Sequence, residues 1–277
     1  MERDWNAWIG RSEGAADTVT RGMVEAFAAT LDTTADLDAG APAPQGIHWL
    51  LAPPRAPMTE LGPDGHPRRG GFLPPIEAPR RMWAASDVQF LKPIVIGDTV
   101  LRRSTIASVE AKQGSTGPLV FVGIDHRFTV GGETRIEERQ TLVFRDIQPY
   151  TPPARSDEAD ARADFERRLT PDPVMLFRFS AITFNGHRIH YDEPYATGVE
   201  LYPGIVVHAP LTASLCLDLA ARQFGPNRLT RFSFRGVSPA FANESLRIAG
   251  TRGGDDVAFV ASAAGRVIAR ARAGLGA

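Results

Sequence analysis

The spacing of apolar residues near the N-terminus predicts a helix. Val19, Met23, Phe27 and Leu31 recur at every fourth position, so they fall on one face of a helix over residues 14–31. This is the first of two long helices that the pattern predicts.

The second predicted helix covers residues 210–224 and begins with a proline, which the first turn of a helix tolerates. Ser214, Asp218 and Arg222 are four residues apart, so they form one narrow polar stripe. The other positions are almost all apolar, and a helix of this kind is buried on nearly all sides.

Each predicted helix is followed by segments rich in β-branched and aromatic residues, which are typical of strands. In the first half these segments are residues 88–91, 99–101, 119–122, 128–130 and 140–144. In the second half they are residues 229–235, 245–251, 256–261 and 266–272. Gly131-Gly132 predicts a hairpin between the last two strands of the first half.

The two halves therefore repeat one order of elements, a helix and then a meander of strands. Residues 93–100 and 239–246 both begin with proline, have a polar residue at the sixth position and end in an apolar residue. We predict an α+β fold built from two copies of one unit. In each unit an antiparallel sheet wraps around a helix, which is the hot-dog fold, so the whole chain would be a double hot-dog.

Two irregular stretches interrupt this plan. Residues 42–79 contain ten of the 22 prolines yet also many apolar residues, so we expect an ordered segment, here called the flap, that lies over another part of the fold. Residues 151–173 are charged and bounded by prolines, with a short helix expected over residues 157–169. They form the predicted linker between an N-terminal hot-dog, 1–150, and a C-terminal one, 174–277.

Composition excludes several classes of function. The net charge of −1 gives no sign of a nucleic-acid or anionic-membrane partner. Cys216 is the single cysteine, which excludes an internal disulfide and favours a cytoplasmic location. Lys92 and Lys112 are the two lysines, so chemistry through a lysine Schiff base is improbable.

Chemistry is concentrated in residues 182–195, here called the histidine segment. It contains His187 and His190, and His208 follows soon after, so three of the six histidines fall within 22 positions. Histidine exchanges protons near neutral pH, so the cluster indicates proton transfer. The alternative is a chance group of loop histidines that hydrogen-bond to the backbone.

The histidine segment resembles a known family. Phe184 to Asp192 reads Phe-Asn-x-His-x-Ile-His-Tyr-Asp, and residues 202–212 also match. This pattern resembles the MaoC-like double hot-dog hydratases and dehydratases, and most closely the subfamily of mesaconyl-C4-CoA (3-methylfumaryl-CoA) and itaconyl-CoA hydratases. The resemblance implies reversible addition of water to an enoyl-thioester by the C-terminal half, with a non-catalytic N-terminal half.

The same resemblance assigns roles to single residues. His190 would be the main acid–base group, and Asn185, at the position of the family's aspartate, would orient water because it cannot ionise. The expected substrate-binding residues are His187, Arg188, Asp192, Gly204 and His208. Arg188 could contact the distal carboxylate of a dicarboxylic substrate, whereas Asp192 could instead be a helix cap.

Partners and cofactors follow from the resemblance too. The substrate would be carried on coenzyme A or on acyl carrier protein, no cofactor or metal is expected, and the protein would be a homodimer. Four alternatives remain open: a general (R)-3-hydroxyacyl-thioester dehydratase, a hot-dog thioesterase, a non-catalytic acyl-binding scaffold, and a metal site. The metal site would use His187, His190, Asp192 and His208.

Overall fold

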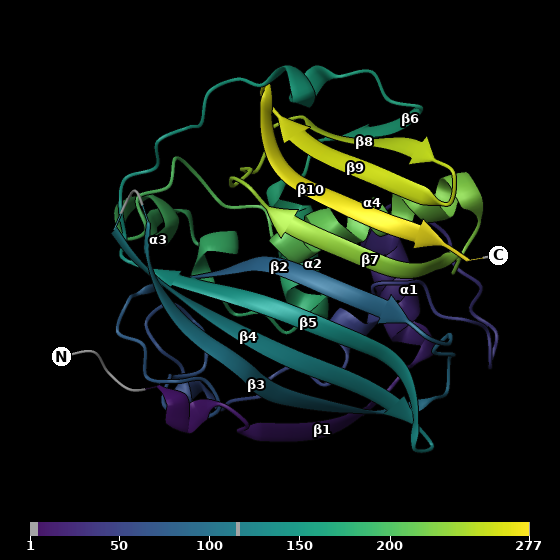
Figure 1. Ribbon diagram of the computed structural model, residues 1–277, viewed down its shortest axis with the longest axis horizontal. Coiled ribbons are helices and arrows are strands. Elements are labelled where there is room, and N and C mark those ends of the chain that lie inside the picture. Colours follow the sequence, from purple (N-terminus) through teal and green to yellow (C-terminus); the bar gives the residue numbers. More distant parts are fainter. Residues whose placement is uncertain (1–4, 115–116, 277) are drawn as a thin grey trace.

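The computed structural model describes residues 5–114 and 117–276, and within them ten strands form one antiparallel sheet (Figure 1). The strands of the first half are β1 (Ser12–Thr18), β2 (Arg80–Phe90), β3 (Thr99–Gly114), β4 (Gly117–Val130) and β5 (Glu133–Arg145). Those of the second half are β6 (Phe165–Leu169), β7 (Leu229–Gly236), β8 (Leu246–Gly253), β9 (Asp256–Ala263) and β10 (Arg266–Leu275). Their order across the sheet is β1-β3-β4-β5-β2-β7-β10-β9-β8-β6.

The two halves join where β2 pairs with β7 at the centre of the sheet. Val88 lies opposite Phe232 there, and both side chains are almost completely buried. The junction is therefore part of the core, and the two units form one continuous sheet, as the prediction of a double hot-dog requires. The hairpin at Gly131-Gly132 is confirmed between β4 and β5.

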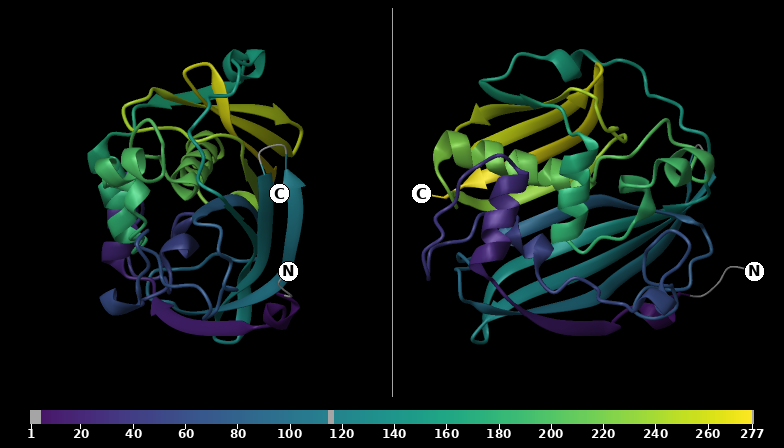
Figure 2. Two further views of the ribbon diagram at one scale, coloured as in Figure 1. Left: turned by 90° about the vertical axis from the view of Figure 1, so that its left-hand side faces the viewer. Right: turned by 180° about the vertical axis from the view of Figure 1, so that it is seen from behind.

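The helices lie against one face of this sheet, as the view from behind shows (Figure 2). They are α1 (Arg21–Thr30), α2 (Pro173–Ile182), the short α3 (Glu193–Gly198) and α4 (Ala209–Phe224). In α4 every residue from 211 to 220 is buried, which confirms the predicted central helix. Among the described residues, no helix has both the length and the apolar character needed to cross a lipid bilayer.

The polar stripe of α4 is satisfied inside the fold. Asp218 is buried, and its carboxylate accepts hydrogen bonds from Arg222 on the same helix and from Arg167 on β6. Ser214 donates to the carbonyl of Pro210 (2.8 Å). Each buried polar group on the stripe therefore has the partner that burial demands.

The first helix is shorter than predicted. Residues 12–18 form β1, an edge strand paired with β3, and the helix begins at Arg21. Thr20 is the last residue with an extended backbone before the helix. Its side chain accepts a hydrogen bond from the N–H of Met23 (3.1 Å) and so caps the helix. The expected helix over residues 14–20 is thus wrong.

The predicted linker also has structure of its own. The helix expected over residues 157–169 is reduced to a 3₁₀ turn at Asp157–Asp160, and residues 165–169 are β6, paired with β8. Alternate residues of β6 are partly buried and exposed, a period of two that a strand satisfies and a helix does not.

Candidate active site

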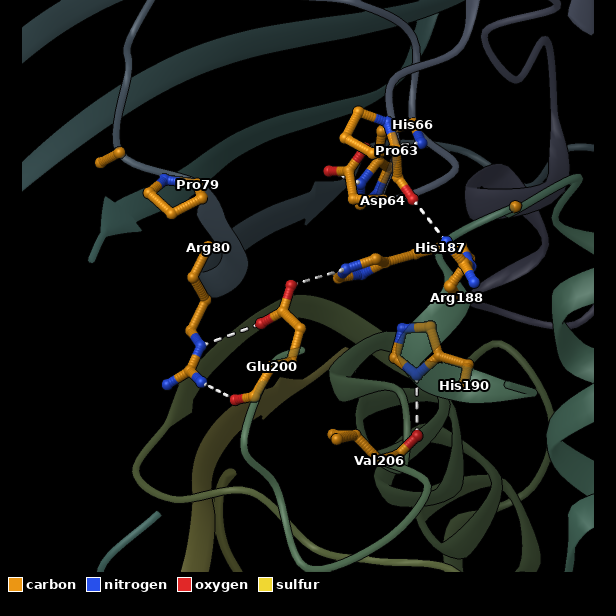
Figure 3. A network of polar contacts seen from close by, with 12 residues as sticks. Pro63, Asp64, His66, Pro79, Arg80, His187, Arg188, His190, Glu200 and Val206 are labelled. Atoms are coloured by element: carbon orange, nitrogen blue, oxygen red, sulfur yellow. Dashed lines mark hydrogen bonds and ion pairs between the residues drawn. The ribbon is translucent and has the colours of Figure 1, made fainter. Parts of the chain in front are cut away.

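The flap is ordered, and its tip lies against the histidine segment. Leu61 and Pro67 form an antiparallel bridge that closes a short loop. Within this loop, the carbonyl of Asp64 accepts a hydrogen bond from the N–H of Arg188 (2.9 Å), and the carbonyl of Pro63 accepts one from its guanidinium (3.0 Å) (Figure 3). The prediction of an ordered flap is confirmed, and the surface that it covers is the histidine segment.

Four of the six histidines form a continuous row of rings. The ring centroids of His66 and His187 are 4.1 Å apart, and those of His187 and His190 are 5.3 Å apart. His190 stacks on His208 with a centroid distance of 3.6 Å and an interplanar angle of 18°. Because His66 comes from the flap, both halves of the chain contribute to the row.

His190 is held in one tautomer. Its Nδ1 lies 2.7 Å from the carbonyl oxygen of Val206, and a carbonyl only accepts, so Nδ1 carries the hydrogen (Figure 3). The other ring nitrogen, Nε2, therefore has a free lone pair. Burial, and next the proximity of the His208 ring, lower the pKa of His190 well below its usual value. The ring is thus neutral at pH 7, which is the form that can accept a proton.

His208 lies at the start of the central helix and is fully enclosed. Its Nε2 is 2.8 Å from the hydroxyl of Ser180 on α2. Burial lowers the pKa of His208 to about 3, and the proximity of His187 adds to this effect. His208 is therefore a neutral ring that supports the stacked face of His190.

A buried carboxylate, that of Glu200, lies beside His187. Glu200 accepts a hydrogen bond from Nε of Arg80 (3.0 Å), and its second oxygen lies 3.8 Å from Nε2 of His187 (Figure 3). Burial acts to raise the pKa of Glu200, but His187 and Arg80 together lower it below the usual value. Arg80 also lies over the ring of Tyr202, 4.4 Å from its centroid. The ion pair thus holds the Glu200 carboxylate beside His187.

The flap contributes a carboxylate–imidazole pair. The ring Nδ1 and the backbone N–H of His66 both approach the carboxylate of Asp64, at 3.0 and 3.1 Å. Burial acts to raise the pKa of Asp64, but these hydrogen bonds outweigh it and lower the pKa. Burial, followed by the charge of Arg81, holds the pKa of His66 well below its usual value. The pair is therefore a carboxylate beside a neutral ring.

The two flap residues and His187 form a group of potential metal ligands. One potential ligand atom each from Asp64, His66 and His187 lies within 4.8 Å of the others, so these three residues could hold a cation. The alternative metal set suggested by the sequence does not converge in this way. In that set, His190 is bonded to a carbonyl and Asp192 to an arginine.

The neighbours of the histidine row that the sequence did not reveal are Asp64, His66, Arg80 and Glu200. The first two lie in the flap and the last two are 120 residues apart. For His66, the sequence did offer one signal, namely that a histidine lies within the proline-rich flap. No local pattern marks Arg80 or Glu200, because only folding brings them together.

Comparison with known proteins agrees with this geometry. The family model for hydroxyacyl-thioester dehydratase type 2 matches residues 46–242. That range contains nearly the whole flap, the histidine segment and α4. The chain belongs to the hydroxyacyl-thioester dehydratase type 2 family.

Several individual proteins are also similar to this chain. The chain is 41% identical over 256 residues to the mesaconyl-C4-CoA hydratase of Chloroflexus aurantiacus, and the match covers 92% of this chain and 91% of that protein. Among solved structures, a MaoC-like dehydratase superimposes with a TM-score of 0.75 at 15% identity, covering 98% of both chains. A Mycobacterium tuberculosis protein with a double hotdog fold gives a TM-score of 0.61 at 13% identity and covers 96% of each chain. The structural likenesses establish the double hot-dog fold.

Asn185, the residue at the aspartate position of the resemblance, is engaged in a local turn in this family member. Its side-chain oxygen accepts a hydrogen bond from the backbone N–H of His187 (3.0 Å), and its own N–H donates to the carbonyl of Ser180 (2.8 Å). This Asx turn orients the chain between α2 and His187. Its role toward water stays a prediction.

Arg188 and Asp192 pair with each other. Two guanidinium nitrogens of Arg188 lie 2.9 and 2.7 Å from one carboxylate oxygen of Asp192, and the guanidinium also lies 4.1 Å from the ring centroid of Tyr195. The carboxylate of Asp192 caps α3 by accepting from the N–H of Tyr195 (3.1 Å), so the helix-cap alternative is confirmed. Arg188 therefore connects the flap to α3.

Gly204 does not need to be glycine for steric reasons within the described chain. A Cβ at this position would meet no atom within 4 Å. The role of Gly204 in substrate binding stays a prediction.

Proposed function

We propose that the protein catalyses reversible hydration of an enoyl-thioester, with a short, branched, dicarboxylic enoyl-CoA such as mesaconyl-C4-CoA as substrate. The observation that carries the chemistry is His190. It is a buried, neutral ring whose Nδ1 is committed to Val206 and whose Nε2 is free. The 41% identity to a mesaconyl-C4-CoA hydratase supports the substrate class.

The reaction can be written with His190 as the one group that exchanges the proton. Nε2 removes a proton from water while the water oxygen bonds to the β-carbon of the enoyl group. The π electrons of the double bond move onto the α-carbon and the thioester oxygen. The imidazolium then returns the proton to the α-carbon, so water is added overall and His190 is regenerated.

The negative charge that develops on the thioester oxygen needs hydrogen-bond donors. No side chain caps the start of α4, and Pro210 follows Ala209. Among the described residues, the N–H of Ala209 has no acceptor, and it adjoins His208, on which His190 stacks. Donors at a helix N-terminus stabilise such charge, and each is worth roughly 10²–10³ in rate.

A second candidate function is that of a general (R)-3-hydroxyacyl-thioester dehydratase, because the matching family model is described as a hydroxyacyl-thioester dehydratase. The two candidates differ in whether the substrate has a second carboxylate. The proposal requires no cofactor beyond the coenzyme A of the substrate. We also expect a homodimer, which sedimentation equilibrium of the purified protein would establish.

The test is a comparison of kcat/KM for mesaconyl-C4-CoA, itaconyl-CoA and crotonyl-CoA, followed by loss of enoyl-thioester absorbance. We expect both dicarboxylic thioesters to be hydrated faster than crotonyl-CoA. Equal values would assign the protein to the general dehydratase class. Release of free coenzyme A, without hydration, would instead identify a thioesterase.

A further inference from the structure

The register of β2 directs Arg81 to the covered face of the sheet. Arg81 lies opposite Phe144 on β5, and Trp83 lies opposite Leu142. Directly opposed residues of antiparallel strands point to the same side. Phe144 is completely buried in the core on that side, so Arg81 points inward as well.

A bulge makes this orientation possible. The pairing shifts between Trp83 and Ala85, so Ala84 is an extra residue on β2. Beyond the bulge, inward positions of β2 include Ser86 and Val88, both buried. Without the extra residue the alternation would continue and Arg81 would face outward.

The other arginines around the site already have partners. Arg80 is paired with Glu200, and Arg188 with Asp192. Arg69 donates to the carbonyl oxygens of residues 76 and 79, at 2.6 and 2.7 Å.

Arg81 differs from these arginines. Within residues 5–114 and 117–276, its guanidinium has no hydrogen bond and no ion pair, although the side chain is partly buried. Burial lowers the pKa of Arg81 to about 10, against the opposing influence of Asp64. The group is still a cation at pH 7, and a cation in such surroundings is stabilised when an anion binds.

This cation stands beside the row of histidines. Its charge is the largest electrostatic influence on His66, after burial itself. His66 contacts His187, which in turn contacts His190. The unpaired guanidinium therefore acts on the flap end of the row of histidines, where His66 and Asp64 lie.

We propose that Arg81 binds the free carboxylate of the dicarboxylic substrate and so determines specificity for that class. The inference rests on the proposed function. In 3-methylfumaryl-CoA the carboxylate is attached to the carbon that receives the hydroxyl group, so its partner must stand close to the proton-transfer residue. A planar guanidinium can bind a carboxylate through two parallel hydrogen bonds, and Arg81 has its donors unused.

The experiment measures the ratio of kcat/KM for mesaconyl-C4-CoA to that for crotonyl-CoA in the full-length protein. Arg81→Met keeps most of the side-chain volume and removes the charge. We expect the ratio to fall by roughly 30-fold or more, because removing one partner of an enclosed charge pair has effects of that order. Arg81→Lys keeps a charge without the two-pronged geometry, so its ratio should be intermediate.

Arg103→Met is the matched control. Arg103 is an exposed arginine on β3, away from the histidine row, and its substitution should leave the ratio unchanged. Thermal unfolding of each variant identifies any that is misfolded. If Arg81→Met does not fold, Arg81→Lys decides, since an unchanged ratio in that variant overturns the proposal.

The outcomes separate this inference from the function on which it rests. If the wild-type protein shows no preference for the dicarboxylic thioester, the proposed substrate class fails, whatever Arg81 does. If the wild type shows the preference and Arg81→Met retains it, the assignment of Arg81 alone fails. A loss of activity on both substrates in equal proportion would show a structural role and also overturn the assignment.

Discussion

Gly65 in the flap and Gly186 in the histidine segment touch backbone to backbone. A Cβ on Gly65 would lie 1.9 Å from the carbonyl oxygen of Gly186, and a Cβ on Gly186 would lie 2.8 Å from that of Gly65. Gly65 also has a φ of +84°, a backbone angle that residues with a side chain rarely adopt. Two glycines therefore allow the two halves of the chain to meet at the site.

Gly65→Ala should separate the flap from the histidine segment. The added methyl group collides with backbone that cannot rotate away, so we expect the free energy of unfolding to fall by about 1–3 kcal/mol and kcat/KM to drop. Gly71→Ala is the control in the same flap, because a Cβ there meets no atom within 4 Å and its φ is not positive. Equal behaviour of the two variants in urea unfolding and turnover would show that the contact is unimportant.

His190→Gln should remove the base and leave the fold intact. Glutamine can still donate a hydrogen bond to Val206, but its amide cannot accept a proton near neutral pH. We expect kcat to fall by about 10²–10⁴, the usual worth of general acid–base catalysis, with little change in thermal stability. Turnover close to that of the wild type would exclude His190 from the mechanism.

Asn185→Asp and Asn185→Leu separate the turn from the chemistry. Aspartate can still accept the hydrogen bond from the N–H of His187, so the Asx turn should persist, whereas leucine removes the acceptor. We expect Asn185→Asp to keep more activity than Asn185→Leu, and its stability to be nearer that of the wild type. If both variants were as active as the wild type, neither the turn nor the amide would matter for hydration.

Much of the fold could be predicted because its signals are local. The hairpin at Gly131-Gly132 and the buried helix at 209–224 follow from residue types and spacing over a short stretch. The edge strand β1 could not, because Ser12–Thr18 is almost entirely exposed and has no alternating apolar pattern. Its extended conformation depends on pairing with β3, where Ser12 lies opposite Thr105 and Thr18 lies opposite Thr99, residues far apart in the chain.

The site was predictable to the same extent. His187, His190 and His208 come from one short region, and the structure places all three in the row. His66 and Glu200 join them through tertiary contacts that no local pattern encodes. Composition shows that charged groups are present, but it cannot show which of them is left without a partner.

Stability should fall as the pH drops below neutrality. His208 has a pKa of about 3 in the folded protein, whereas an unfolded histidine has its usual value of about 6.5. The unfolded chain therefore binds more protons between these two values, so the folded state loses stability as pH falls from about 6.5 to about 3. Above pH 6.5 this residue contributes no pH dependence.

The corresponding measurement is urea unfolding between pH 7.5 and pH 4, where each such group contributes a slope of up to about 1.4 kcal/mol per pH unit. His208→Asn keeps an amide that can bond to Ser180 and cannot titrate, so its slope should be smaller than that of the wild type. An identical slope in both proteins would contradict the assignment of this pH dependence to His208.

Arg188→Met distinguishes the two arginines that could govern the substrate. The guanidinium of Arg188 connects Asp192 on α3 to the carbonyl of Pro63 in the flap. Because this ion pair is partly exposed, its loss should lower the free energy of unfolding by only about 1 kcal/mol or less. A looser flap should raise KM for mesaconyl-C4-CoA and for crotonyl-CoA in the same proportion, so the ratio of their kcat/KM values should not change.

Asp192→Asn, which keeps the helix cap and removes the charge, should behave in the same way. A fall in the ratio on Arg188→Met would instead show that Arg188 binds the substrate carboxylate, as the sequence suggested, and would contradict the role assigned to Arg81.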